Sequence, residues 1–213
     1  HGDTDTDSHS SLPTINVSKD TFYKNELIPF KEAINEGIDM IMMGHLVVPS
    51  LDASNKPATH SYPITTSLLK DELNFDGVVI TDAMEMGALS KNISNEESVV
   101  RAIEAGADII LLPIDAKNAI KSIKEAVLDG RISEKRINQS VKKIWNLKKE
   151  AGLLSDKGFP DWDRIETLLG SKEHTRVANK IAANSITLIK DDKNSIPIKP
   201  EKTKKISHII MSI

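Results

Sequence analysis

The chain has 213 residues, of which 39% are hydrophobic and 28% charged, a composition typical of a globular protein with one or two domains. A net charge of -3 predicts no nucleic-acid partner, and the lack of cysteine excludes disulfides and thiolate chemistry. No apolar run approaches the roughly 20 residues that a membrane-spanning helix requires.

Short apolar runs alternate with helical patterns along the first 150 residues, which is typical of βα units around a parallel sheet. The predicted strands are 38–43, 77–81 and 108–112. The predicted helices are 65–73, 95–105, 116–128 and one that opens at 133–136. Since three strands cannot close an eight-stranded barrel, the pattern accounts for only part of one.

The composition changes after Gly152, and residues 156–161 read as a linker that crosses the surface. Beyond this linker the sequence predicts a helix over 172–184. Two strand-like segments follow the helix, at 185–189 and 206–210, separated by a charged turn region.

Asp7 and His9 lie one residue apart in a polar loop formed by the first nine residues. A carboxylate beside an imidazole can fix the tautomer of the ring while the ring passes a proton, so the two residues are a candidate acid/base dyad. A solvated turn is the alternative, because Asp, Thr and Ser are turn formers. A calcium loop of the EF-hand type is excluded, because Ser8 and Thr14 stand where that loop needs Gly and Glu.

A second carboxylate, Asp82, follows the apolar run Val78–Ile80 at the carboxyl end of a predicted buried strand. Barrel enzymes carry catalytic residues at this end of their strands. A helix N-cap is the alternative, and both roles can hold at once, since N–H donors keep a carboxylate ionised. Glu85, one helical turn further on, is expected to be solvated or bonded to a neighbour.

The first loop reads His-Gly, four further residues and Asp-Ser-His, and the second strand ends in Thr-Asp-Ala. Met-Gly-His at 43–45 and Ala-Gly-Ala-Asp at 105–108 accompany these two motifs. In order and spacing, residues 1 to about 155 resemble bacterial β-N-acetylglucosaminidases of glycoside hydrolase family 3. The lysine-containing start of that family's loop, and every earlier barrel strand, are absent from the sequence.

The resemblance implies an α/β fold: the C-terminal part of a (β/α)8 TIM barrel, followed by the start of a second α/β domain. The expected boundaries are 1–152 for the barrel part, 153–170 for a linker and 171–213 for the second domain. It also implies that the missing N-terminal half of the barrel is required for function.

For the chemistry, the resemblance implies a retaining β-N-acetylhexosaminidase that acts on peptidoglycan fragments or related glycans. Asp82 would attack the anomeric carbon, while His9, oriented by Asp7, would protonate the leaving oxygen and then activate water. Phosphate in place of water is compatible with this chemistry, because a neutral acid/base repels an anion less than a carboxylate does.

Three further residues are expected to border the sugar: His1, His45 and Met86. For His45, a packed loop histidine is an equal alternative. The resemblance implies a carbohydrate substrate and no cofactor or metal. Two other functions stay open: a β-glucosidase of the same family, and a catalytically silent barrel that binds sugar.

Overall fold

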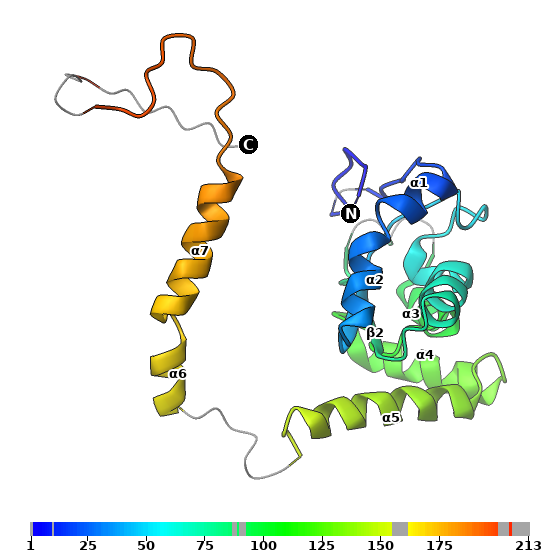
Figure 1. The fold of residues 1–213 in the computed structure, drawn as a ribbon. Helices are drawn as coiled ribbons and strands as arrows, with labels where there is room; N and C mark the ends of the chain where they lie inside the picture. Colours follow the sequence, from blue (N-terminus) through cyan, green and yellow to red (C-terminus); the bar gives the residue numbers. More distant parts are fainter. Residues whose placement is uncertain are drawn as a thin grey trace. The chain divides into compact units, whose positions relative to one another are not determined.

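The computed structural model describes residues 2–9, 11–86, 89, 93–154, 162–199 and 205. The chain divides into two compact units, His1–Gly158 and Phe159–Ile213. Figure 1 shows both units, and each is described by itself.

The first unit alternates short strands with helices, in the order expected of βα units (Figure 1). Its elements are α1 (Lys19–Lys24), α2 (Ile28–Asn35), β1 (Met40–Met43), η1 (Ala58–His60), η2 (Pro63–Glu72), β2 (Val78–Thr81), α3 (Asn95–Ala105), α4 (Ala116–Leu128) and α5 (Glu134–Glu150). The first two predicted strands are confirmed, and α3 and α4 begin and end at the predicted residues. The predicted helix over 65–73 is η2, which is wound as a π-helix.

The strands β1 and β2 are parallel, and their register pairs Met40 with Val78 and Met43 with Thr81. The third predicted strand, 108–112, is wrong as a strand: only Ile109 forms an isolated parallel bridge, to Ile80. The backbone N–H of Leu111 donates to the Thr81 hydroxyl at 3.0 Å instead of to a strand carbonyl. The third segment therefore runs along β2 without extending the ladder.

Side-chain caps fix the starts of α3, α4 and α5. Ser94 accepts from the Glu97 amide at the start of α3, and Ser133 accepts from the Arg136 amide at the start of α5. Asp115 does the same for α4. Such caps satisfy amides that have no partner within the helix, so these boundaries are encoded locally.

One apolar core lies between the two strands and the helices that flank them, with Ile15, Ile41 and Val79 among its buried residues. Two smaller clusters join α3 to α4 and to Ile132. Helix α5 lies along one end of the unit (Figure 1) and buries only Ser140 among its side chains. The apolar residues along one face of α5 are half-buried (Ile137, Ile144 and Leu147) or exposed (Val141).

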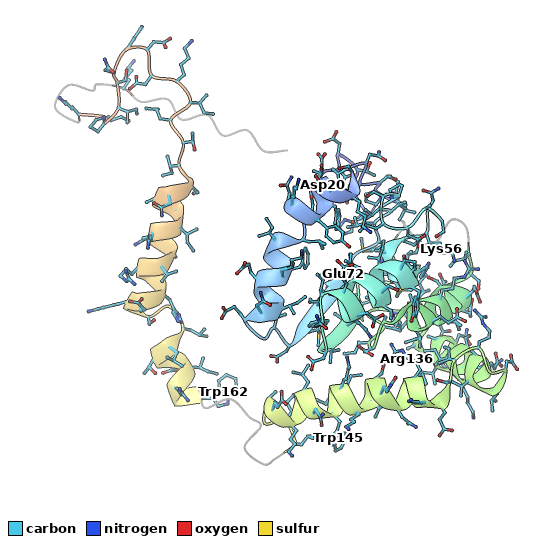
Figure 2. All side chains as sticks on the ribbon, turned by 45° about the vertical axis from the view of Figure 1, so that its right-hand side comes forward. Asp20, Lys56, Glu72, Arg136, Trp145 and Trp162 are labelled. Carbon is cyan, nitrogen blue, oxygen red and sulfur yellow. The ribbon has the colours of Figure 1, made fainter. Side chains whose placement is uncertain are left out.

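A buried carboxylate, Asp108, joins three elements at the amino end of β2. Its side chain is 1% exposed and accepts from Arg136 Nη1 at 3.1 Å, the Val79 amide at 3.0 Å and the Ser140 hydroxyl. Lys70 Nζ lies 3.4 Å away. Arg136, labelled on α5 in Figure 2, thus bonds this carboxylate from a third element. Burial raises the pKa of Asp108, but the hydrogen bonds and the two cations outweigh it, so the pKa lies below its usual value.

An apolar groove of about 510 Å³ lies between α2, β1 and η2. Phe30 on α2 and Met42 on β1 line it and are 46% and 52% exposed. In the described part of the chain β1 pairs with β2 along one edge only. The other edge of β1 is thus open.

The second unit contains α6 (Trp162–Leu168) and α7 (Lys172–Ser185). Helix α7 confirms the helix predicted over 172–184, whereas α6 falls inside the range expected to be a linker. Residues 186–189 form no strand, because they have no pairing partner among the described residues. The segments 156–161 and 206–210 lie outside the described residues, and the second domain stays a prediction. No helix in the described ranges has the length and hydropathy to cross a membrane.

Replacing Asp108 with Asn should destabilise the fold by roughly 3–5 kcal/mol, because Arg136 and Lys70 would lose their buried counter-charge. Thermal unfolding of the full-length protein measures the change. The exposed Asp76→Asn is the control, and we expect it to stay within about 0.5 kcal/mol. Because the pKa of Asp108 is lowered in the folded state, its stabilisation is present at neutral pH. It is lost as the pH falls below the ordinary carboxyl value of 3.8. Equal melting of Asp108→Asn and wild type would contradict this role.

Expressed alone, the 213-residue chain should self-associate, because the open edge of β1 and the apolar groove are both accessible. Light scattering after size exclusion measures its mass. The double variant Met42→Lys, Phe30→Glu places charges on the groove and should reduce association. Leu128→Lys, an exposed position on α4 away from the groove, should not. A monodisperse wild-type monomer would refute the prediction.

Candidate active site

The parallel register brings two loop starts together at the carboxyl ends of β1 and β2. Met43 faces Thr81, so Gly44 and Asp82 leave their strands at the same level. The backbone N–H of Asp82 donates to the Met43 carbonyl at 2.9 Å, which extends the ladder by one bond. Asp82 therefore sits on a rigid mount at the sheet edge where parallel α/β proteins place their chemistry.

The Asp82 side chain is half-buried and is oriented by its own turn. The Ala83 amide donates to Asp82 Oδ1 at 2.8 Å. The next helix in the described chain, α3, begins only at Asn95 and is capped by Ser94. Asp82 thus accepts a backbone donor as expected, but it does not cap a helix.

The turn that follows Asp82 is tied to its surroundings by backbone bonds. The Met84 amide donates to the Leu111 carbonyl at 3.0 Å, and the Met86 amide donates to the Ala83 carbonyl at 3.1 Å. Met86, expected to border the sugar, has a buried side chain. Glu85 is exposed, as expected for a solvated residue.

His45 is fully buried beside this turn. Its Nε2 donates to the Ala83 carbonyl across 3.0 Å, and its Nδ1 lies 2.7 Å from the Thr59 hydroxyl. Burial lowers the pKa of His45, although the Ala83 bond and the nearby Asp82 charge oppose this effect. A neutral ring with its proton on Nε2 satisfies both contacts, because Thr59 can donate to Nδ1.

Asp7 and His9 contact each other as the spacing predicts. Asp7 Oδ1 lies 2.7 Å from His9 Nδ1 and accepts the His9 backbone N–H at 3.0 Å. These two bonds hold the pKa of Asp7 below its usual value. The side chains of His9 and Asp7 are 77% and 65% exposed, whereas Ser8 between them is buried. Both side chains of the dyad are therefore accessible to solvent.

The segment that follows the first loop is bonded to the chain just beyond the carboxyl end of β1, the end of the sheet at which Asp82 also lies. Just after the loop, Ile15 donates to the Val47 carbonyl at 2.8 Å, and Val47 donates to the Pro13 carbonyl at 2.9 Å. Val47 follows the end of β1 by only four residues. Gly2 and Asp82 line the same groove. Figure 1 shows the start of the chain beside α1. His1, another expected sugar contact, lies outside the described residues.

Thr59 is a residue of this region that the sequence did not single out, whereas Ser8 was used only as part of the Asp-Ser-His motif. Thr59 sits in the short turn η1, 14 residues after His45, and no local pattern links the two. Ser8 is flanked by the two dyad residues and reads as an ordinary turn residue. Within the described ranges, no group of three or more His, Asp or Glu side chains is arranged to hold a metal.

Residues 1–147 match the family model for the glycosyl hydrolase family 3 N terminal domain. Beta-hexosaminidase A of Pseudoalteromonas piscicida is 29% identical over 231 residues, which span 99% of this chain and 38% of that protein. Beta-N-acetylglucosaminidase/beta-glucosidase of Cellulomonas fimi is 27% identical over 184 residues, spanning 82% of this chain and 32% of that protein.

A solved structure is also similar, the glycoside hydrolase family 3 β-N-acetylglucosaminidase of Paenibacillus sp. str. FPU-7. Its TM-score is 0.77 at 38% identity, over 90% of this chain and 37% of that protein. The chain therefore spans 32 to 38% of the length of these three proteins. The predicted resemblance and the predicted α/β class are confirmed. The chain belongs to glycosyl hydrolase family 3, and residues 1–147 match its N-terminal, TIM-barrel-like α/β domain.

Proposed function

We propose that the full-length protein is a retaining glycoside hydrolase that removes β-linked N-acetylglucosamine from peptidoglycan fragments or related glycans. One observation carries the proposal. The carboxylate of Asp82 stands at the carboxyl end of β2, and the segment that follows the hydrogen-bonded Asp7–His9 dyad is bonded to Val47, just beyond the carboxyl end of β1. A retaining mechanism needs one carboxylate nucleophile and one acid/base group, and these residues supply both.

In the first step, a carboxylate oxygen of Asp82 attacks the anomeric carbon, and we assign the attack to Oδ2 because Oδ1 holds the Ala83 amide. The bond from this oxygen to the anomeric carbon forms as the glycosidic bond breaks. The proton on His9 Nε2 passes to the leaving oxygen. In the second step, His9 takes a proton from water, the water oxygen attacks the same carbon, and Asp82 leaves as a carboxylate.

A histidine suits both halves of this reaction. An ordinary imidazole titrates near pH 6.5, so it can give and take a proton near neutral pH. Because Asp7 Oδ1 occupies the Nδ1 side of the ring, the proton in transit belongs on Nε2. The ionised Asp7 also stabilises the imidazolium form.

Catalysis should also require protein beyond these residues. The dyad side chains are 77% and 65% exposed, and water would compete with any sugar bound to them. We therefore propose that the remaining part of the barrel covers the dyad and completes the sugar site. The described part of the chain supplies the reacting groups without their enclosure.

The second candidate is a β-glucosidase, because the name of the Cellulomonas fimi relative joins that activity to N-acetylglucosaminidase. The P. piscicida and Paenibacillus proteins carry hexosaminidase-type names, and for this reason we favour N-acetylglucosamine. Rates on aryl β-N-acetylglucosaminide and aryl β-glucoside separate the two candidates. No turnover of either substrate by the full-length protein would favour a silent sugar-binding barrel.

The nucleophile is tested by Asp82→Asn, which is nearly isosteric but removes the attacking charge. The variant should fold normally, with kcat reduced roughly 10³-fold or more. A 2-fluoro sugar with a dinitrophenolate leaving group should label Asp82 in the wild type, as read by mass spectrometry of peptides. The control Glu85→Gln alters an exposed carboxylate three residues away and should be nearly as active as wild type. Label on Glu85 would overturn the assignment.

The acid/base is tested by His9→Ala. The first step should slow roughly 10²- to 10⁴-fold for leaving groups of high pKa but little for dinitrophenolate, which departs without a proton. Asp7→Asn should show the same trend more weakly, since it disturbs the ring without deleting it. Asp5→Asn changes an exposed carboxylate of the same loop and is the matched control. If kcat/KM of His9→Ala falls equally for every leaving group, the acid/base lies elsewhere.

A further inference from the structure

We propose that His45 and Thr59 act as positioning residues that hold the turn carrying Asp82, and that His45 does not contact the sugar. The inference rests on the proposed role of Asp82 as nucleophile. It replaces the expectation that His45 borders the substrate. The residues that carry it are His45, Thr59 and Ala83.

The ring of His45 bridges the ends of both strands. His45 lies two residues beyond Met43, the last residue of β1. The Nε2 atom of its ring donates to the carbonyl of Ala83, the residue that follows Asp82. On the other side, the Asp82 amide is bonded to the Met43 carbonyl. The backbone around Asp82 is therefore fixed to the β1 side by one main-chain bond before the carboxylate and one side-chain bond after it.

The direction of the carboxylate depends on the second of these bonds. The Ala83 amide holds Asp82 Oδ1 at 2.8 Å, and the Ala83 carbonyl accepts from His45. Fixing the carbonyl limits rotation about the Ala83 backbone, and the amide that orients the carboxylate belongs to the same residue. The Met86 amide also donates to this carbonyl at 3.1 Å, but Met86 belongs to the same turn, so the His45 bond is the one that ties the carbonyl to the β1 side. Loss of the His45 bond would thus let the turn and its carboxylate change direction while β2 stays in place.

Thr59 supports the ring from behind. Its hydroxyl is 2.7 Å from His45 Nδ1 and 3.1 Å from the Gly44 carbonyl, and its side chain is fully buried. The Ala83 carbonyl can only accept, so the ring proton belongs on Nε2 and Nδ1 accepts. The single proton of the Thr59 hydroxyl then goes to Nδ1, its shorter contact, and not to the Gly44 carbonyl. The ring has no exposed surface and both nitrogens are engaged, so it offers no group to a sugar hydroxyl.

Two substitutions of His45 separate these roles. A Gln amide nitrogen lies as many bonds from Cβ as the imidazole Nε2, and it can donate to the Ala83 carbonyl. An Asn amide nitrogen corresponds to Nδ1, and it can reach Thr59 but not Ala83. His45→Asn is therefore the test variant: it keeps a polar side chain and the contact with Thr59, and it loses the bond to the turn. His45→Gln, which keeps the bond to the turn, is its matched control.

In the full-length protein, His45→Asn should lower kcat about 10- to 100-fold with KM changed less than about twofold, since misplacement of a reacting group slows the chemical step. His45→Gln should recover kcat to within about threefold of wild type. The rate of Asp82 labelling by the 2-fluoro sugar should follow kcat in both variants. The reduction should be equal for all leaving groups, in contrast to His9→Ala.

Thr59 gives an independent pair of variants. Thr59→Val removes the hydroxyl at constant shape and should lower kcat less than His45→Asn does, whereas Thr59→Ser should stay near wild type. This pair decides the question if His45→Asn fails to fold, because Thr59→Val leaves the ring in place.

Three outcomes would overturn the inference. A change confined to KM would make His45 a sugar contact, and equal kcat for His45→Gln and His45→Asn would remove the bond to Ala83 from the explanation. Normal kcat in both His45→Asn and Thr59→Val, with wild-type label on Asp82, would overturn the inference alone. Wild-type label on another residue would overturn the proposed nucleophile and this inference together.

Discussion

The parallel pairing of β1 with β2 is the constraint on which the rest of the candidate site depends. With Met43 opposite Thr81, the residues that follow each strand emerge side by side, and Asp82 adds its amide to the ladder. A shift of one residue would turn the strand faces over and move Asp82 away from the loop that carries His45. The catalytic chemistry that we propose thus depends on four residue pairs and one further hydrogen bond.

The carboxylates at the two ends of β2 differ in their surroundings. At the amino end, Asp108 is enclosed by Arg136, Lys70, Ser140 and the Val79 amide, so its charge serves the architecture. At the carboxyl end, Asp82 holds one backbone donor and stays half-buried, so its charge is accessible to a ligand. The same residue type is structural where cations surround it and, in the function that we propose, acts as the nucleophile where the strand opens into a turn.

Much of the fold could be predicted from the sequence because its signals are local. The caps Ser94 and Asp115 fix α3 and α4 within their own first turns, and apolar runs mark β1 and β2. The third strand was predicted wrongly, because the Leu111 amide donates to the Thr81 hydroxyl. A pattern of hydrophobic residues cannot predict such a side-chain hydrogen bond. At the site, the Asp7–His9 contact follows from spacing, since the partners are two residues apart. The contact of His45 with Thr59 does not, because its partners meet only through the tertiary fold.

Gly77 lies just before the amino end of β2, and Asp82 lies just after the carboxyl end of the same strand. A methyl group there would lie 2.5 Å from the Phe75 ring and 2.6 Å from the Asp39 carbonyl oxygen, closer than real side chains approach. Its carbonyl also accepts from Lys143 at 2.9 Å, so the backbone is held on both sides. Any larger residue therefore requires the Phe75 ring or the Asp39 backbone to shift. Asp39 accepts the Val78 amide at the start of the same pairing that ends at Thr81, so a shift there disturbs the register that positions Asp82. The absence of a side chain at Gly77 thus helps to fix the position of Asp82, the nucleophile that we propose.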